Sequence, residues 1–311
     1  GASAQKKSER SALLAIRLRH RQDFPSATLA LPMDEPSASL SLKSGSVSAP
    51  ARERMTAVGR VSEKDSLRPI LGGLTRQTIA KRLEVILAVD HGVEIEADIK
   101  SMFAGGVTIV ACEPESSPAA VLNRVVETVT TPWFLLLDQH VVLHDPRTLA
   151  TLRALATYRR VATVSCMRIR QAGFRDGAPL TFHSAGTFPA RVDFTGIPSV
   201  AFEAPVTTEA FPRMTYPVAA NGLEFALVSR KAWTDVGGLD ETAYPFEGHG
   251  LAFCLAAVLA GWLHLNTTAI SALDTLQRPP ERLDVLGSET FSLDQLASIL
   301  ARTAVVRRLD G

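Results

Sequence analysis

From Met55 onward, short apolar runs alternate with segments of helical spacing, and this alternation limits the possible folds more than any other feature of the chain. Alternating strands and helices are typical of βαβ units, which build a largely parallel sheet covered by helices. The predicted strands are 55–61, 83–89, 106–111, 133–137 and 161–167. The predicted helices between them are 66–78, 117–128 and 146–158. The sequence therefore predicts an α/β fold, and its 46% apolar residues are enough to fill such a core.

The second half of the chain is less regular. Between about residues 168 and 220, glycine, proline, phenylalanine and histidine follow no period, which predicts a long loop region. Helices are predicted again at 230–236 and 251–260. Asp145-Pro146 predicts the start of the helix at 146–158, because Asp accepts free N–H groups there and Pro is tolerated at the first helical position.

The two ends of the chain differ in composition from its middle. Residues 1–52 contain Ser, Pro and Ala clusters around an alternating stretch at 38–43, which predicts a short strand or hairpin in an N-terminal extension. Residues 277–311 are predicted as a C-terminal helical tail, with a capping box at Ser292-Leu293-Asp294-Gln295. The main domain is therefore expected over 53–276.

The net charge and the cysteines indicate which partners and which cellular compartment suit the chain. With 33 Lys and Arg against 32 Asp and Glu, the net charge is +1, so nucleic acid and anionic membrane surfaces are disfavoured as partners. The three cysteines lie in apolar runs without metal-ligand spacing, which predicts buried reduced thiols. The run 251–263 is too short for a membrane span, which needs about 20 apolar residues, and no signal peptide is recognised. A cytoplasmic protein without an integral membrane segment is expected.

Asp138 and His140 are the first candidates for chemistry. Asp138 ends the very apolar strand 133–137, and His140 follows two residues later, so strand alternation or a tight turn can aim both side chains at one point. A carboxylate and an imidazole can together hold a divalent ion. The competing interpretation is that Asp138 caps a turn and His140 is partly exposed at the end of the sheet.

Several short motifs occur in an order that resembles the family 2 glycosyltransferases with the GT-A fold, over about residues 54–275. They are Gln77-Thr78, Asp90 after an apolar strand, Asn123-Arg124, Asp138-Gln139-His140, Asn221-Gly222, Gly237-Gly238-Leu239-Asp240-Glu241 and Gly261-Trp262. The resemblance implies a Rossmann-like, mixed but mostly parallel sheet flanked by helices, and Asp138-Gln139-His140 corresponds to a D-x-H variant of the D-x-D motif.

The resemblance also implies a donor site. Asp90 would contact the nucleoside, although an Asp after a strand is often a turn former. Asn123 and Arg124 would reach the diphosphate or position Asp138, although an Arg on a helix is often solvated. Asp138 and His140 would bind Mn²⁺ or Mg²⁺, and Asp274 falls where the family often places a further metal ligand. An Asp that ends a strand can equally cap the residues after it.

The segment where the family carries a catalytic base departs from the pattern. Inverting members have a Glu-Asp pair before the last core helix, whereas this chain has Glu247-Gly248-His249-Gly250. Counting from the two flanking motifs places His249 at either the Asp or the Glu position. Imidazole titrates near pH 6.5 and suits general-base work near neutrality, so His249 is the candidate base and Glu247 either orients it or replaces it. The alternative is that these residues only shape a loop.

The resemblance therefore implies a metal-dependent hexosyltransferase. It would move a sugar from a nucleotide-diphosphate donor, a UDP-sugar, to an acceptor hydroxyl with inversion. The missing Asp keeps open a non-catalytic module that binds a nucleotide sugar or a partner protein. A nucleotidyltransferase is a third class, but the first strand is not followed by a Gly-rich phosphate loop. The extension at 1–52 would pack on the core, cover the acceptor site or join copies of the chain into a homo-oligomer.

Overall fold

The computed structural model describes most of the chain between residues 54 and 302. The described residues are 54–62, 67–93, 99, 102–113, 116–171, 180–193, 199–203, 215–275, 282–286, 291, 295, 298–299 and 302. The predicted strand or hairpin at 38–43 lies outside them, as does Ser292 of the predicted capping box. The proposed division into an extension, a main domain and a tail stays a prediction.

Four parallel strands form one half of the main sheet, as predicted. They are β1 (Met55–Val61), β2 (Leu83–Val89), β3 (Val107–Ala111) and β4 (Trp133–Asp138). Their order is β4-β1-β2-β3, so β1 lies between β2 and β4. Each strand is a run of apolar residues, and β1, β2 and β4 are buried on both faces, as expected for a parallel sheet covered by helices.

The other half of the sheet is mixed. Its strands are β5 (Val141–Val142), β6 (Val161–Gln171), β7 (Leu180–Ser184), β10 (Thr215–Val218), β11 (Phe225–Ser229) and β12 (Leu263–Asp274). β11 runs antiparallel between β4 and β6, and β12 runs parallel to β6. Among the described residues ten strands belong to this sheet, in the order β10-β12-β6-β11-β4-β1-β2-β3 with β5 on β12 and β7 on β6. The predicted mixed sheet is confirmed.

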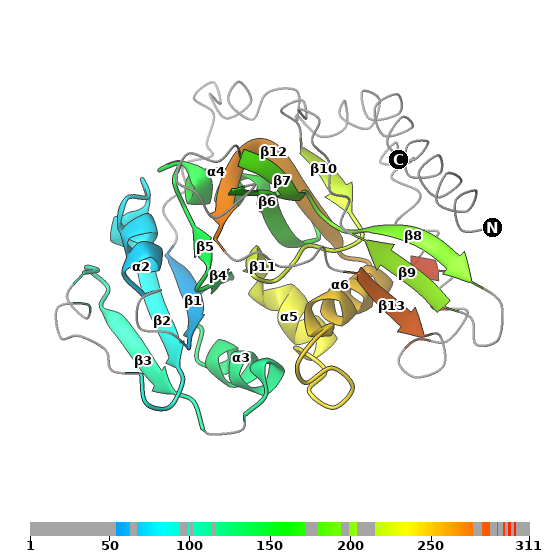
Figure 1. The fold of residues 1–311 in the computed structure, drawn as a ribbon, viewed down its shortest axis with the longest axis horizontal. Helices are drawn as coiled ribbons and strands as arrows, with labels where there is room; N and C mark the ends of the chain where they lie inside the picture. The colour runs from blue at the N-terminus through cyan, green and yellow to red at the C-terminus, as the bar shows by residue number, and fades with distance from the viewer. Residues whose placement is uncertain are drawn as a thin grey trace.

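A second, smaller sheet corrects two predictions. It consists of β8 (Phe188–Asp193), β9 (Ser199–Glu203) and β13 (Arg282–Leu286), seen at the right of Figure 1. The loop predicted over 168–220 in fact contains the strands β7 to β10. Of these, β9 pairs both with its neighbour β8 and with the distant β13. The predicted helical tail at 277–311 also contains β13, whose residues Arg-Leu-Asp-Val-Leu alternate with the period of a strand. Of the described residues after β13, those at 295, 298, 299 and 302 are helical, as predicted.

The helices cover both faces of the main sheet (Figure 1). Apolar side chains of α2 (Leu67–Thr75) and α4 (Thr148–Leu155) pack in one core cluster. Those of α3 (Pro118–Glu127), α5 (Arg230–Val236) and α6 (His249–Leu259) pack in a second cluster, against the other face. A short 3₁₀ helix, η3 (Ala80–Arg82), precedes β2. In the part of the chain that the structure describes, no helix is long and apolar enough to cross a membrane.

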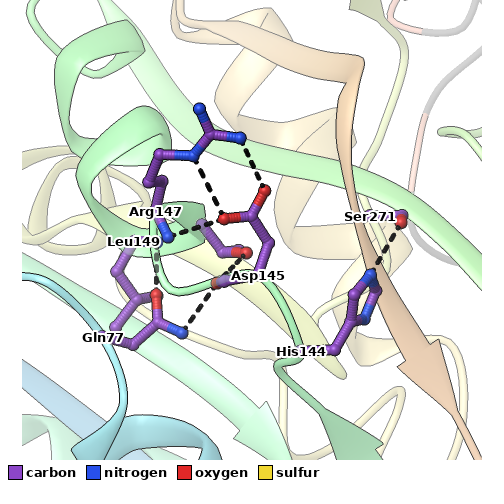
Figure 2. Close-up of polar contacts among 7 residues, drawn as sticks. Gln77, His144, Asp145, Arg147, Leu149 and Ser271 are labelled. Carbon is purple, nitrogen blue, oxygen red and sulfur yellow. Dashed lines mark hydrogen bonds and ion pairs between the residues drawn. The ribbon is translucent and has the colours of Figure 1, made fainter.

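Asp145 works differently from the predicted cap. Figure 2 shows its carboxylate accepting a hydrogen bond from the backbone N–H of Arg147 (2.8 Å) and pairing with the Arg147 guanidinium (3.3 Å). The helix therefore begins two residues after Pro146, at Thr148. Burial alone would raise the pKa of Asp145, but the hydrogen bonds and charge of Arg147 outweigh burial and hold this pKa below its usual range. The true cap is Gln77, whose Oε1 accepts the N–H of Leu149 (3.0 Å) while its Nε2 donates to the Asp145 carbonyl (3.0 Å).

Candidate functional site

Two candidate carboxylates lie at one edge of the main sheet because parallel strands end there together. Asp138 is the last residue of β4, and Asp90 directly follows β2. Arg60, on β1 between these strands, is in register with Asp138. Crevices at the carboxyl ends of parallel strands are the usual ligand sites of open α/β sheets. Asp90 and Asp138 therefore lie at the end of the sheet where ligands usually bind, and their donor contacts stay predictions.

Asp90 is held by a bidentate ion pair. Arg60 donates to its two carboxylate oxygens at 3.0 and 2.9 Å, and both side chains are about one third exposed or less. The Cys112 thiol lies beside them. Burial, followed by the hydrogen bond and charge of Asp90, raises the pKa of Cys112 to about 11, so this thiol is protonated at neutral pH. The predicted nucleoside contact of Asp90 stays a prediction.

Asn123 connects α3 to the segment that follows α5. Its Nδ2 donates to the Leu239 carbonyl (2.9 Å) and to Glu241 Oε1 (2.6 Å), while its Oδ1 accepts the Leu239 N–H (2.9 Å). A Cβ at Gly238 would lie 2.7 Å from that Oδ1, so the segment can come this close only because residue 238 is glycine. Arg124, the next residue, is exposed. The amide of Asn123 thus has a structural role, and its predicted donor contact stays untested.

Asp138 and His140 form a tight turn after β4. The backbone N–H of His140 donates to Asp138 Oδ1 (2.9 Å), and the N–H of Asp138 donates to the Glu224 carbonyl (2.7 Å). Gln139 fixes the imidazole. Its Oε1 accepts the Ser62 N–H (2.7 Å), so its Nε2 must be the donor to His140 Nε2 at 3.1 Å, which leaves that ring nitrogen as the acceptor.

Asp274 is brought to this turn by the pairing of β12 with β5. It lies opposite Val141, and the next residue, Thr275, donates through its N–H (2.8 Å) and hydroxyl (2.9 Å) to the His140 carbonyl. The carboxylate of Asp274 is buried and lies 3.7 Å from Arg168 Nη1. Within the described ranges, no group of three or more His, Cys, Asp and Glu side chains is arranged to hold a metal ion. Asp274 is therefore near the turn but is oriented to Arg168.

Glu224 and Arg168 lie beside the candidate site, and the sequence did not single them out. Arg168 on β6 is only 6% exposed, and its Nη1 lies 3.3 Å from Glu224 Oε2 as well as 3.7 Å from Asp274. One guanidinium is thus shared between two carboxylates. The available signal was the position of Glu224 directly before the fully buried strand β11, because charged side chains are mostly exposed.

His249 is the first residue of α6, and Glu247 lies in the loop before it. Gly248 adopts the left-handed conformation (φ +79°) that directs the chain into the helix. Glu247 is exposed, whereas His249 is half-buried and its Nδ1 is buried with no hydrogen-bond partner. Burial lowers the pKa of His249, and the charge of Glu224 partly opposes this. The imidazole is consequently neutral near pH 7, as a general base must be.

The turn before β11 is fixed by a buried polar network. Asn221 Nδ2 donates to Thr163 Oγ1 and to the Leu265 carbonyl, both at 2.9 Å. His264 bridges Thr163 (2.7 Å) and the Cys254 carbonyl (2.9 Å) through its two ring nitrogens, and burial lowers its pKa to about 4. His264 is therefore a core residue, and the position of Asn221 is set by β6, β12 and α6 together.

The fold resembles several solved glycosyltransferases. A mannosyltransferase, PcManGT from Pyrobaculum calidifontis in complex with GDP-Man and Mn²⁺, matches 87% of this chain and 70% of its own at a TM-score of 0.51 and 12% identity. GalNAc-T7 with UDP, GalNAc and Mn²⁺ matches 80% of this chain and 48% of its own, with a TM-score of 0.53 and 12% identity. TarS 1–349 from S. aureus matches 71% of this chain and 60% of its own, with a TM-score of 0.50 and 12% identity.

The chain has a GT-A fold. At 12% identity this similarity establishes the fold alone, and the chain spans about half of the matched GalNAc-T7 chain. No protein-family model matches the sequence. No curated protein matches it significantly.

On this GT-A fold the predicted site residues form two groups. Asp138, His140 and Asp274 meet around the turn after β4, and Asp90 lies at the same edge beside Arg60. His249 belongs to the second group, at the start of α6. Glu224 lies between the two, because its backbone contacts Asp138 and its charge acts on His249.

Proposed function

We propose that this chain is a metal-dependent glycosyltransferase. It moves a sugar from a nucleotide-diphosphate donor, with UDP-sugars as the first choice, to an acceptor hydroxyl with inversion. The observation that supports this most is the turn of Asp138 and His140 at the end of β4, at the carboxyl edge of a GT-A sheet. The solved structures of PcManGT and GalNAc-T7, which have the same fold, contain Mn²⁺ with GDP-Man and with UDP and GalNAc respectively.

The turn after β4 fits a divalent cation with two protein ligands. Asp138 is half-buried at the sheet edge, and His140 Nε2 has a lone pair directed at Gln139 that a metal would take over. Oxygen and imidazole ligands suit Mn²⁺ and permit Mg²⁺, which commonly completes its shell with water and substrate phosphates. Asp274 can join as a third ligand only by giving up its ion pair with Arg168.

The bound cation would stabilise the negative charge that develops on the departing diphosphate. The residues of the chain do the remaining work. Asp138 and His140 would hold the cation, and Asp90 with Arg60 would present polar groups to the nucleoside at the end of the neighbouring strands. Cys112, Cys166 and Cys254 are buried and free, as predicted, which is in keeping with a cytoplasmic protein.

The acceptor hydroxyl is deprotonated by His249. Its half-buried ring is neutral near pH 7, because burial lowers its pKa. Glu247 is the alternative base, and it lies exposed two residues before His249. A neutral, partly desolvated imidazole is better matched to proton removal near neutrality than an exposed carboxylate is.

The test is an assay for sugar transfer with a panel of UDP- and GDP-sugars, with and without Mn²⁺. Nucleotide release and transferred sugar are measured by mass spectrometry. Asp138→Asn is expected to reduce turnover by about 100-fold or more, because the cation loses its charged ligand. Asp235→Asn is the matched control, since Asp235 is an exposed helical carboxylate paired with Lys231 at 3.0 Å. Equal turnover in Asp138→Asn and the wild type would contradict the metal site.

A second candidate function is binding of a nucleotide sugar without transfer. It is favoured by two observations: the Asp of the family's Glu-Asp pair is missing before α6, and no three-ligand metal group occurs among the described residues. Binding of nucleotide diphosphates without release of product from any donor of the panel would support this candidate.

A further inference from the structure

Ser62 and Gln139 lie side by side because the parallel strands β1 and β4 end there together. Ser62 directly follows β1, and Gln139 directly follows Asp138, the last residue of β4. The Ser62 N–H donates to Gln139 Oε1 (2.7 Å), and Gln139 Nε2 donates to Ser62 Oγ (2.7 Å). Gln139 Nε2 also lies 3.1 Å from His140 Nε2. We call these three contacts the Gln139 bridge.

The Gln139 bridge decides which ring nitrogen of His140 carries the proton. A backbone N–H can only donate, so the amide atom of Gln139 that faces the Ser62 N–H is the oxygen, and the atom that faces His140 is the NH₂ group. A neutral imidazole has one nitrogen with a proton and one with a lone pair. Because His140 Nε2 faces a donor, Nε2 keeps the lone pair and Nδ1 carries the proton.

The surroundings of the Gln139 bridge are held in place. Gln139 is only 8% exposed. The backbone of His140 is fixed from two sides: its N–H donates to Asp138 Oδ1 (2.9 Å), and its carbonyl accepts the N–H (2.8 Å) and the hydroxyl (2.9 Å) of Thr275. The imidazole can therefore leave Gln139 only by rotation of the His140 side chain.

The lone pair on His140 Nε2 can serve only one partner. A metal ion binds a neutral imidazole through its unprotonated nitrogen, and in His140 this is the nitrogen that Gln139 occupies. The N–H of Gln139 and a divalent cation therefore compete for the same lone pair. When the state that can bind a ligand is only partly populated, the apparent affinity falls by that fraction.

We propose that Gln139 is a positioning residue for His140. The Gln139 bridge keeps Nε2 unprotonated, as a metal ligand must be, and it holds the ring away from the cation until the His140 side chain rotates. The inference rests on the proposed function, in which Asp138 and His140 hold the cation. Asp138 is not part of the Gln139 bridge, so its carboxylate can bind a cation first, and His140 joins after its ring leaves Gln139.

The first test is the protonation of the His140 ring in the metal-free protein. Long-range ¹H–¹⁵N NMR spectra in mildly alkaline buffer distinguish the two ring nitrogens, and His140→Ala assigns the signals. The wild type should show an unprotonated Nε2 and a protonated Nδ1. In Gln139→Leu, which has no donor, the share of the form with a proton on Nε2 should rise. Ser62→Ala is the control, because it keeps the backbone N–H that orients the amide and should keep the wild-type form.

The second test is calorimetric titration of Mn²⁺ in the absence of nucleotide. Gln139→Leu should bind Mn²⁺ about 3-fold more tightly or better than the wild type, because the hydrogen bond that stabilises the metal-free state is lost. In the His140→Ala background, Gln139→Leu should change the affinity no further, since the bridge then has no ring to hold. Thermal unfolding of each variant shows whether it is folded.

The outcomes separate this inference from the proposed function. A metal-free wild type with the proton on Nε2 of His140 would overturn the Gln139 bridge, whatever the metal affinity. An unprotonated Nε2 with equal Mn²⁺ affinity in the wild type and folded Gln139→Leu would overturn the competition. Absence of Mn²⁺ binding to both proteins would refute the metal site of the proposed function, and the competition with it. The first measurement needs only the wild type, so it decides even where Gln139→Leu does not fold.

Discussion

At the scale of single residues, the carboxylates near the sheet edge differ in what surrounds them. The side chain of Asp274 is only 2% exposed and forms an ion pair with Arg168. If Asp274 bound a metal ion instead, the buried guanidinium of Arg168 would lose this partner, which is costly. Asp138 is half-buried and accepts a backbone hydrogen bond within its own turn. Asp138 is therefore the carboxylate that can bind a cation with the least rearrangement, and it is the more informative residue to mutate.

Asn123 is the residue whose role can be tested by stability. Asn123→Ala removes the partner of the Leu239 N–H and two further hydrogen bonds, so the free energy of unfolding should fall by about 1–3 kcal/mol in urea denaturation. Glu241→Ala is the control, since it removes only the exposed bond and should cost less than about 0.5 kcal/mol. Unchanged stability with weakened donor binding would instead show Asn123 to be a donor contact.

The sequence proposed Asp138, His140 and His249 as candidate residues, and these stay predictions, but it did not reveal their neighbours. Asp274 meets the turn after β4 only because β12 pairs with β5, and Arg168 meets Glu224 only because β11 inserts between β4 and β6. Such pairings are non-local, and a single sequence carries no periodic signal for them. The shared ion pair of Arg168 with Glu224 and Asp274 could therefore be found only from the structure.

At the scale of elements, apolar runs were the reliable signal. The predicted strand 55–61 and helix 230–236 have the bounds of β1 and α5. The start of α4 was predicted less accurately. The side chain of Asp145 bonds within the turn before this helix, and Gln77, from another element, caps it. The strands after Met167 were missed because they depend on pairing rather than on a pattern of burial.

The backbone conformation of Gly248, the residue before α6, should affect turnover. Gly248 has φ +79°, so Gly248→Ala should lower the free energy of unfolding by about 1 kcal/mol and also reduce kcat, because His249 is displaced. Gly237→Ala is the matched control: this glycine has φ +92° at the end of α5, and a Cβ there meets nothing within 4 Å. A kcat loss of equal size in both variants would show that α6 does not position His249.

At the scale of the whole molecule, the GT-A sheet brings the turn after β4 and the start of α6 to opposite sides of the turn 221–224. β4 supplies Asp138 and His140 at its carboxyl end, α6 supplies His249, and the turn 221–224 lies between them. These parts are widely separated in the sequence, and only the mixed order of the strands makes them neighbours. Under the proposed function, the end of β4 is the donor side and the start of α6 is the acceptor side, and Glu224 lies on the turn between them.

The most direct test of the central claim is calorimetric titration of UDP into the protein with and without Mn²⁺, for the wild type and Asp138→Asn. UDP should bind to the wild type in the presence of Mn²⁺, and removal of the metal or of the Asp138 charge should each weaken binding by about 10-fold or more. Asp235→Asn should bind as the wild type does. UDP affinity that is independent of Mn²⁺ and unchanged in Asp138→Asn would contradict a metal-dependent donor site at the end of β4.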